Sequence, residues 1–351
     1  LLSFKIPIMS SAVKFIKHII FCLIIFSNTC FGKEFDKLFV VYEPIESSSQ
    51  IEKSINNSFN TMIYRLSGNN SPSNIWKIIN AGNSRKDFIT SYSIKNFENK
   101  SYLEVNFDKD LLISQFNKLS IPLIGNSRPV ILFLINIDSG LEEPYFLTNN
   151  QSKSEIDILI KNYLKEMSSQ RGIFLELPEL DLIDINELNN YGKLINSNKF
   201  FNDKYISDDL ISISISKIGI SEWSVNGSVE LNIDNQNFVD IFMKEFINYT
   251  NQSIDNLLNK SRIDVSERGL INISIDNVNT LQDYKKSREV IQNLVGAKDI
   301  SINKFNLDTI HYQLYIYGNF NSLLKEISEN NFLKVIDVYE ESSSIHLSFQ
   351  K

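Results

Sequence analysis

Apolar and polar positions in the first third of the chain predict a small mixed domain. From Ile51 to Leu66 apolar residues recur every three or four positions, which is the spacing of one helix face. Gly68 follows and is expected to end that helix. The other predicted elements are a strand at 38–44, a weaker helix at 75–79, a hairpin at 87–108 that turns at Asn99 and Lys100, and a helix at 109–119. Residues 33–124 therefore predict a β-α-β-β-α domain.

The middle of the chain contains a nearly unbroken apolar run at residues 128–138. Such a run predicts a strand that is buried on both faces, as in a parallel sheet. A helix pattern at 154–167 and a strand pattern at 172–181 follow, so 128–181 predicts a β-α-β unit. A hairpin and a long helix at about 235–259 complete an α/β domain over residues 125–262.

Residues 263–351 give the clearest succession of elements. Strand-like alternation precedes a helix in which Thr280 is the expected N-cap and Asp283 occupies the capping-box position. Two strands, a second helix and two more strands follow. This β-α-β-β-α-β-β order predicts a ferredoxin-like domain with one added strand. The fold class is therefore α/β and α+β, with three small mixed-sheet sandwiches of which the last is ferredoxin-like.

The N-terminal residues 1–32 have the pattern of a secretory signal peptide. Lys14 and Lys17 precede an apolar run from Ile19 to Phe26, and the small-residue ending reaches Gly32. The run is far shorter than the roughly 20 apolar residues that span a membrane. We therefore expect cleavage near Gly32, a periplasmic location, and no transmembrane segment in the mature chain.

Composition removes several classes of function. The net charge is −7 and no basic block stands out, so no nucleic-acid partner is expected. Both cysteines, Cys22 and Cys30, lie in the predicted signal peptide, so thiol catalysis and cysteine-zinc sites are excluded for the mature chain. Because no phosphate loop or zinc-protease motif is present either, no cofactor is expected.

His311 and His346 are the only histidines after residue 32. Each alternates with apolar residues in a predicted strand, so each is expected to point away from the core of its sheet. In the predicted order their strands lie about three positions apart, which separates them by about 14 Å. They are therefore expected to be solvated side chains and not shared metal ligands.

Four carboxylates surround Pro178, just past the end of a predicted strand, where ligands often collect in open α/β sheets. They are Glu176, Glu179, Asp181 and Asp184. One interpretation is a glycosidase-like pair, which would need carboxyl groups about 5–9 Å apart. The other is a solvated acidic loop, since such residues are mostly exposed.

Three segments in succession resemble a known family: MIYRLSG, LEVNFDKDLLISQFNKLSIPLIGNSRPVILFLINID and RGIFLELPELDLID. Together they are similar to an exported proteobacterial family of unassigned function, domain of unknown function two thousand and sixty-six, over about residues 36–260. The resemblance implies export and a similar fold, and it brings no activity. Its motif residues correspond here to Arg65, Gly68, Gly125, Arg128, Pro129, Pro178 and Asp181.

Arg65 lies in the last turn of its predicted helix, and two roles are open. As an exposed cation it would complement the helix carboxyl end by about 0.3–1 kcal/mol. Alternatively, it would pair with a carboxylate of the neighbouring domain and lock the two together. Asp181 is the expected partner, because the resemblance places both residues in the same motif set.

Three functions are consistent with these patterns. The scarcity of catalytic chemistry favours a non-catalytic envelope interaction or assembly protein, whose partner is an unidentified envelope protein. The alternatives are a carboxylate-dependent hydrolase of an envelope glycan and a small-ligand-binding protein with its site between the first two domains. An exposed apolar edge strand would favour the first, and an enclosed pocket with two carboxylates would favour the second.

Overall fold

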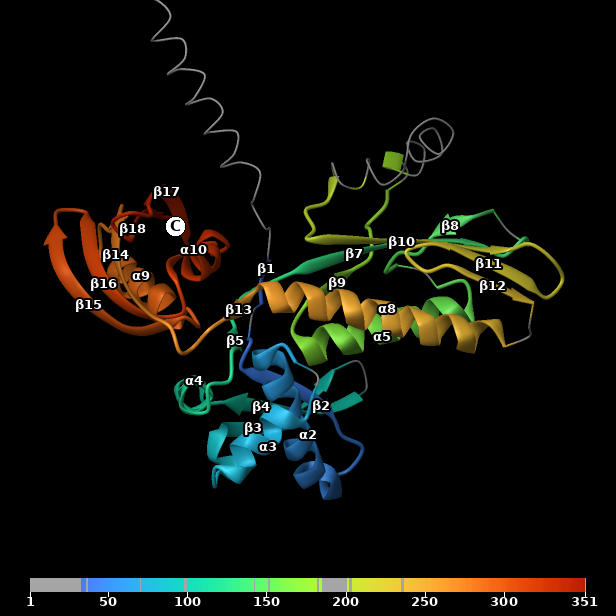
Figure 1. Ribbon diagram of the computed structural model, residues 1–351, viewed down its shortest axis with the longest axis horizontal. Helices are drawn as coiled ribbons and strands as arrows, with labels where there is room; N and C mark the ends of the chain where they lie inside the picture. Colours follow the sequence, from blue (N-terminus) through green and yellow to red (C-terminus); the bar gives the residue numbers. More distant parts are fainter. Residues whose placement is uncertain are drawn as a thin grey trace, which may run out of the picture. The chain divides into compact units, whose positions relative to one another are not determined.

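The computed structural model shown in Figure 1 is a mixed α/β protein. It describes residues 33–350 apart from 36, 70, 98–99, 142, 151, 182, 185–200, 202–203 and 235–236. The predicted signal peptide, residues 1–32, lies outside the described residues. Among the helices that are described, none is both long and apolar enough to cross a membrane.

The first sheet is antiparallel with strand order β2-β4-β3. Helix α2 packs its apolar stripe against this sheet, with Phe59, Met62 and Leu66 fully buried. The predicted hairpin and helices are present. The elements are β2 (Val40–Pro44), η2 (Ser48–Gln50), α2 (Ile51–Ser67), α3 (Ser73–Asn80), η3 (Arg85–Phe88), β3 (Ile89–Phe97), β4 (Lys100–Phe107) and α4 (Lys109–Lys118).

The second sheet is built around β7 (Val130–Asp138), whose residues Val130 to Ile135 are all buried. This strand pairs in parallel with both β9 and β10, as its unbroken apolar run predicts. Helices α5 and α8 run alongside each other against the sheet (Figure 1), and Tyr163 contacts Phe246 between them. The elements are β8 (Tyr145–Phe146), α5 (Glu155–Arg171), β9 (Phe174–Glu176), β10 (Asp209–Lys217), β11 (Glu222–Gly227), β12 (Leu231–Asp234) and α8 (Phe238–Lys260).

The third sheet has five strands in the order β15-β16-β14-β18-β17, and its elements follow the predicted succession. Only β14 and β18 pair in parallel. Thr280 and Asp283 form the expected capping box at the start of α9. The elements are β14 (Arg268–Asp276), α9 (Leu281–Asn293), β15 (Ala297–Asn306), β16 (Thr309–Tyr317), α10 (Phe320–Ser328), β17 (Leu333–Tyr339) and β18 (Ser344–Phe349).

Two short strand pairs connect distant parts of the chain. Strand β1 (Lys33–Glu34) pairs with β6 (Ser127–Arg128), and β5 (Leu123–Ile124) pairs with β13 (Arg262–Ile263). Ile263 also packs into the core beneath the first sheet. The connecting segments therefore add residues to the core of the first sheet, and Arg128 of β6 is fully buried there.

Candidate functional site

Arg65 is buried at the carboxyl end of α2 and is only 2% exposed. The helix ends because Gly68 adopts the left-handed conformation (φ 64°) and donates its N–H to Tyr64. The Arg65 Nη1 atom donates to the carbonyls of Leu38 (2.9 Å) and Val40 (2.8 Å). Its Nη2 atom donates to the carbonyl of Ser169 (2.7 Å), in the last turn of α5.

Two further arginines are buried beside it, and we call Arg65, Arg128 and Arg171 together the arginine junction. Arg128 donates to the carbonyls of Arg65 (2.8 Å) and Ile124 (3.2 Å). Arg171 donates to the carbonyl of Gly68 (3.1 Å) and to a carboxylate oxygen of Asp255 (2.6 Å). The carboxyl end of α2 thus receives two guanidinium groups, and that of α5 receives one.

Helix-end electrostatics explain why these cations tolerate burial. The last carbonyls of a helix have no partner within it and carry partial negative charge, and a guanidinium offers five N–H donors. Burial lowers the pKa of Arg65 to about 10. Burial and the neighbouring Arg65 lower the pKa of Arg128 to about 9. Both groups therefore stay charged at neutral pH and hold the helix ends together.

A buried carboxylate and a lysine extend this arrangement toward the third sheet. Glu326 of α10 is 5% exposed and accepts N–H groups from Val295 (2.7 Å) and Asn126 (3.1 Å). Lys109 donates to the carbonyls of Gln292 (2.9 Å) and Leu294 (3.1 Å), at the end of α9. Glu326 and Lys109 therefore each bind backbone groups of segments that are distant from them in the sequence.

Glycines provide the space that the junction requires. Gly172 ends α5 with φ 58°, and a Cβ atom at this position would lie 2.5 Å from the Arg65 Cγ atom. A Cβ atom at Gly68 would lie 2.8 Å from the Ile124 Cδ1 atom. Both positions need a left-handed backbone and a close approach, which only glycine provides without strain. A Cβ at Gly125 would be in tight contact, 3.4 Å, with the carboxylate carbon of Glu326.

The motif residues implied by the family resemblance therefore fall into two groups. Arg65, Gly68 and Arg128 lie at the junction. Gly125 lies against Glu326, and the carbonyl of Pro129 accepts the Phe174 N–H (3.1 Å). Pro178 and Asp181 belong to the segment that follows β9. There Asp181 accepts the N–H groups of Ile183 and Asp184 (both 2.8 Å) within its own turn.

The predicted pair between Arg65 and Asp181 is wrong. Arg65 does bridge to the neighbouring part of the chain, but its acceptors are three carbonyl oxygens. The alternative of an exposed helix-end cation is also wrong, because Arg65 is buried and caps α5 in place of its own helix. The sequence missed Arg171, Asp255, Lys109 and Glu326. The sequence did contain one signal for Glu326. It lies three residues after Leu323 on the apolar stripe of α10, which predicts that its carboxylate is buried.

Three of the four carboxylates of the acidic segment bond to described residues. Glu179 is exposed, and it is its backbone carbonyl that accepts the Tyr205 hydroxyl (2.6 Å). Glu176 forms an exposed ion pair with Lys33 (2.9 Å). Asp184 is paired with Lys204 and accepts the Asp181 N–H (2.9 Å). The hydrogen bond from Lys204, followed by that from Asp181, lowers the pKa of Asp184. The carboxylates of Asp181 and Asp184 thus stabilise a turn.

His311 and His346 point away from the core of the third sheet, as predicted from the alternation. Both are in register with Ser274 on β14, so they lie two strands apart and not three. This spacing corresponds to about 10 Å, and it arises because β18, not β17, pairs with β14. His346 Nε2 lies 2.8 Å from a carboxylate oxygen of Asp276. His346 is therefore half-buried and hydrogen-bonded to Asp276, which corrects the expectation that it is a fully solvated side chain.

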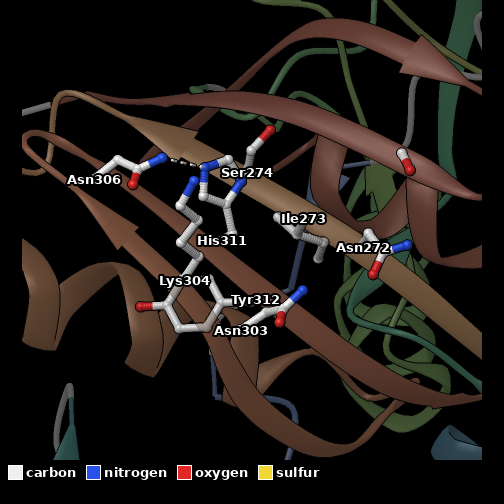
Figure 2. Close-up of a pocket in the computed structure, with 9 residues that line it drawn as sticks. Asn272, Ile273, Ser274, Asn303, Lys304, Asn306, His311 and Tyr312 are labelled. Carbon is white, nitrogen blue, oxygen red and sulfur yellow. Dashed lines mark hydrogen bonds between the residues drawn. The ribbon is translucent and has the colours of Figure 1, made fainter.

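The same polar face contains a cavity of about 410 Å³, which we call the trough (Figure 2). Lys304, Asn306 and His311 lie together on one side of it, with Ser274 on the adjacent strand. Asn306 Nδ2 and His311 Nε2 are 3.5 Å apart. Across the part of the chain that the structure describes, no three His, Cys, Asp or Glu side chains are grouped to hold a metal ion.

Comparison with protein-family models, with curated proteins and with solved structures gives no match to this chain.

Proposed function

We propose that this protein is a non-catalytic interaction or assembly protein of the cell envelope, and that it binds an extended segment of an envelope protein along strand β3. The observation that carries the proposal is the exposed apolar edge formed by β3. Tyr92, Ile94 and Phe97 of this strand are each about half exposed, at 53%, 51% and 51%. An edge strand of this kind offers both backbone hydrogen-bonding groups and apolar side chains to an added strand.

Strand β3 is regular over most of its length. Within the described residues it pairs only with β4. Its one register shift lies at the start of the strand, between Ile89 and Ser91, and the register is uninterrupted from Ser91 to Phe97. It contains no proline, and Lys95 is its one charged residue. Proteins usually protect such edges with bulges, charges or short strands, and β3 has little of this protection.

The other long edges are protected in these ways. Strand β15, the edge of the third sheet, has two register shifts and carries Lys298 and Lys304. Strand β17, at the opposite edge, has a register shift between Val335 and Asp337. In the second sheet, the edge strands β8 and β12 have two and four residues. Among the described strands, β3 is therefore the best candidate for strand addition.

The proposal also includes a three-sandwich architecture, a periplasmic location and a relationship to the exported family. Three small sandwiches, the last ferredoxin-like, would be joined by the arginine junction between the first two and by Lys109 and Glu326 to the third, which supports a scaffold role. The apolar run at residues 19–26 supports export to the periplasm. The convergence of Arg65, Gly68 and Arg128 supports a relationship to the exported family of unassigned function, because three of its motif residues lie at one junction.

The hydrolase alternative receives less support. A glycosidase requires two carboxyl groups that are available to a substrate. Asp181 and Asp184 are instead bonded within one turn, and Glu176 pairs with Lys33. We therefore do not assign a reaction to the acidic segment.

Photocrosslinking in living cells tests the interaction. A photoreactive amino acid at Tyr92, on β3, should give one major adduct whose partner is identified by mass spectrometry. The matched control is the same substitution at Tyr339, which is 55% exposed on the bulged edge strand β17. No adduct is expected from this position.

A second variant tests the mode of binding. Ile94→Lys places a charge on the exposed edge and should abolish the Tyr92 adduct, since lysines on edge strands oppose pairing. Equal adducts from Tyr92 and Tyr339, no adduct from either, or an adduct that persists in Ile94→Lys would each contradict the proposal.

A further inference from the structure

The trough on the third sheet lies far along the chain from β3, and its chemistry is distinct from that of an apolar edge. Its volume of about 410 Å³ falls at the lower end of the range of about 300–1,000 Å³ that is typical of small-molecule sites. Most such sites are lined by apolar side chains. Here seven of the nine described lining residues are polar, and the other two are the core residues Ile273 and Tyr312. This predominantly polar lining favours a strongly hydrated ligand. The polar lining residues are Asn272, Ser274, Asn303, Lys304, His311 and Ser344, together with Asn306.

A β-bulge concentrates polar groups on one side of the trough. Ile302 pairs with Tyr312 and Lys304 pairs with His311, so Asn303 is an inserted residue in β15. The inserted residue interrupts the regular alternation of side chains along β15, and both Asn303 and Lys304 line this cavity. Bulges commonly redirect side chains beside functional sites, and this one brings an amide and a cation together.

The floor of the trough is formed where the outward side chains are short. Asn272 and Ser274 lie on the central strand β14, and Ser344 is in register with Asn272 on β18. The taller Lys304 and His311 stand in register with each other on the neighbouring strands β15 and β16. Within the described residues, the side chains of Asn272, Asn303 and Lys304 form no hydrogen bond or ion pair, so their bonding groups face solvent.

The charged residues around the trough favour a ligand with an anionic group. Lys304 is the one lysine, arginine or carboxylate among the described lining residues. Asp276 and Asp337, on other strands of the same sheet, lie beside His346, at 2.8 Å and 3.9 Å. Asp276 also accepts a hydrogen bond from Thr309 (2.8 Å). The cation of Lys304 is therefore available to an anionic group of a ligand.

From these features we infer that the trough binds a small sugar that carries an oxyanion, either a carboxylate or a phosphate. Amides and hydroxyls both donate and accept hydrogen bonds, which matches the hydroxyl groups of a sugar. The ammonium of Lys304 supplies the complementary charge for the oxyanion. A nucleic-acid strand is disfavoured because it would need exposed aromatic platforms and several cations.

Titration calorimetry on the purified full chain tests this inference with three probes. Glucuronate and glucose 6-phosphate represent the carboxylate and the phosphate form, and glucose is the neutral reference. At least one of the two acids should bind about tenfold more tightly than glucose, as expected for a charge-assisted hydrogen bond. The acid that binds identifies the oxyanion. In an amide-resolved NMR titration, the side-chain amides of Asn272 and Asn303 should shift.

Variants locate the binding. Lys304→Gln should reduce the affinity for the acidic sugar about tenfold, to that for glucose. Lys298→Gln is the matched control, because it removes the same charge from the same strand outside the lining. Asn272→Ala, on β14, should weaken binding of all sugars. Three outcomes would overturn the inference: no binding of either acid, binding of glucose as tight as that of the acids, or equal effects of Lys304→Gln and Lys298→Gln. None of these outcomes would change the crosslinking result expected at β3.

Discussion

Replacing Arg65 by methionine tests the arginine junction most directly. Methionine keeps much of the aliphatic stem but removes the donors to the carbonyls of Leu38, Val40 and Ser169. Each buried acceptor that is left without a partner costs about 1–3 kcal/mol. Removing the guanidinium also recovers several kcal/mol of its burial cost. We expect the free energy of unfolding to fall by a net amount of about 2–4 kcal/mol.

The assay is urea denaturation followed by circular dichroism, with the free energy of unfolding obtained by linear extrapolation. Arg65→Lys should lower the free energy of unfolding by about half as much as Arg65→Met. The ammonium of lysine retains the charge but lacks the planar guanidinium that reaches both sides of the junction. The control is Arg262→Met, at an exposed position on β13, where a change below about 0.5 kcal/mol is expected.

Two results would refute this reasoning. If Arg65→Met is as stable as the wild type, the burial cost of the cation equals or exceeds the value of its hydrogen bonds. If Arg65→Lys is as stable as the wild type, the fork geometry has no importance. In either case the arginine junction would not be what holds α2 to α5.

The remaining predictions concern a glycine, a carboxylate and the N-terminus. Gly172→Ala should destabilise the protein by at least about 1 kcal/mol more than Gly82→Ala, since both have positive φ but only the first places Cβ against Arg65; equal losses in urea denaturation would contradict this. The pKa of Asp276 is lowered: partial burial opposes the shift, but hydrogen bonds from Thr309 and His346 outweigh it. Its stabilising contribution should therefore be complete above its ordinary value of 3.8 and be lost as pH falls through the lower folded value. The stability difference between wild type and Asp276→Asn should accordingly shrink as the pH is lowered below 3.8, and a constant difference would argue against the bond. Intact-mass measurement of protein from the periplasmic fraction should show cleavage near Gly32, and a mature chain that retains its N-terminus would contradict export.

The sequence alone determined most of the secondary structure. The apolar run of β7 predicted a strand buried on both faces, and Thr280 with Asp283 predicted the start of α9. The alternation around His311 and His346 predicted the face on which each lies. These features depend on residues within a few positions of one another, where spacing and capping chemistry act directly.

Only the tertiary structure decided the roles of the charged residues and the form of the trough. Arg65 and its acceptor Ser169 are 104 residues apart, and an arginine before a helix-ending glycine has the same local pattern whether it is exposed or buried. The pairing of β18 with β14 sets the distance between the histidines, and the bulge at Asn303 shifts the register of β15 against β16. Strand order and bulges arise from how several distant segments share one sheet, so no local spacing in the chain specifies them.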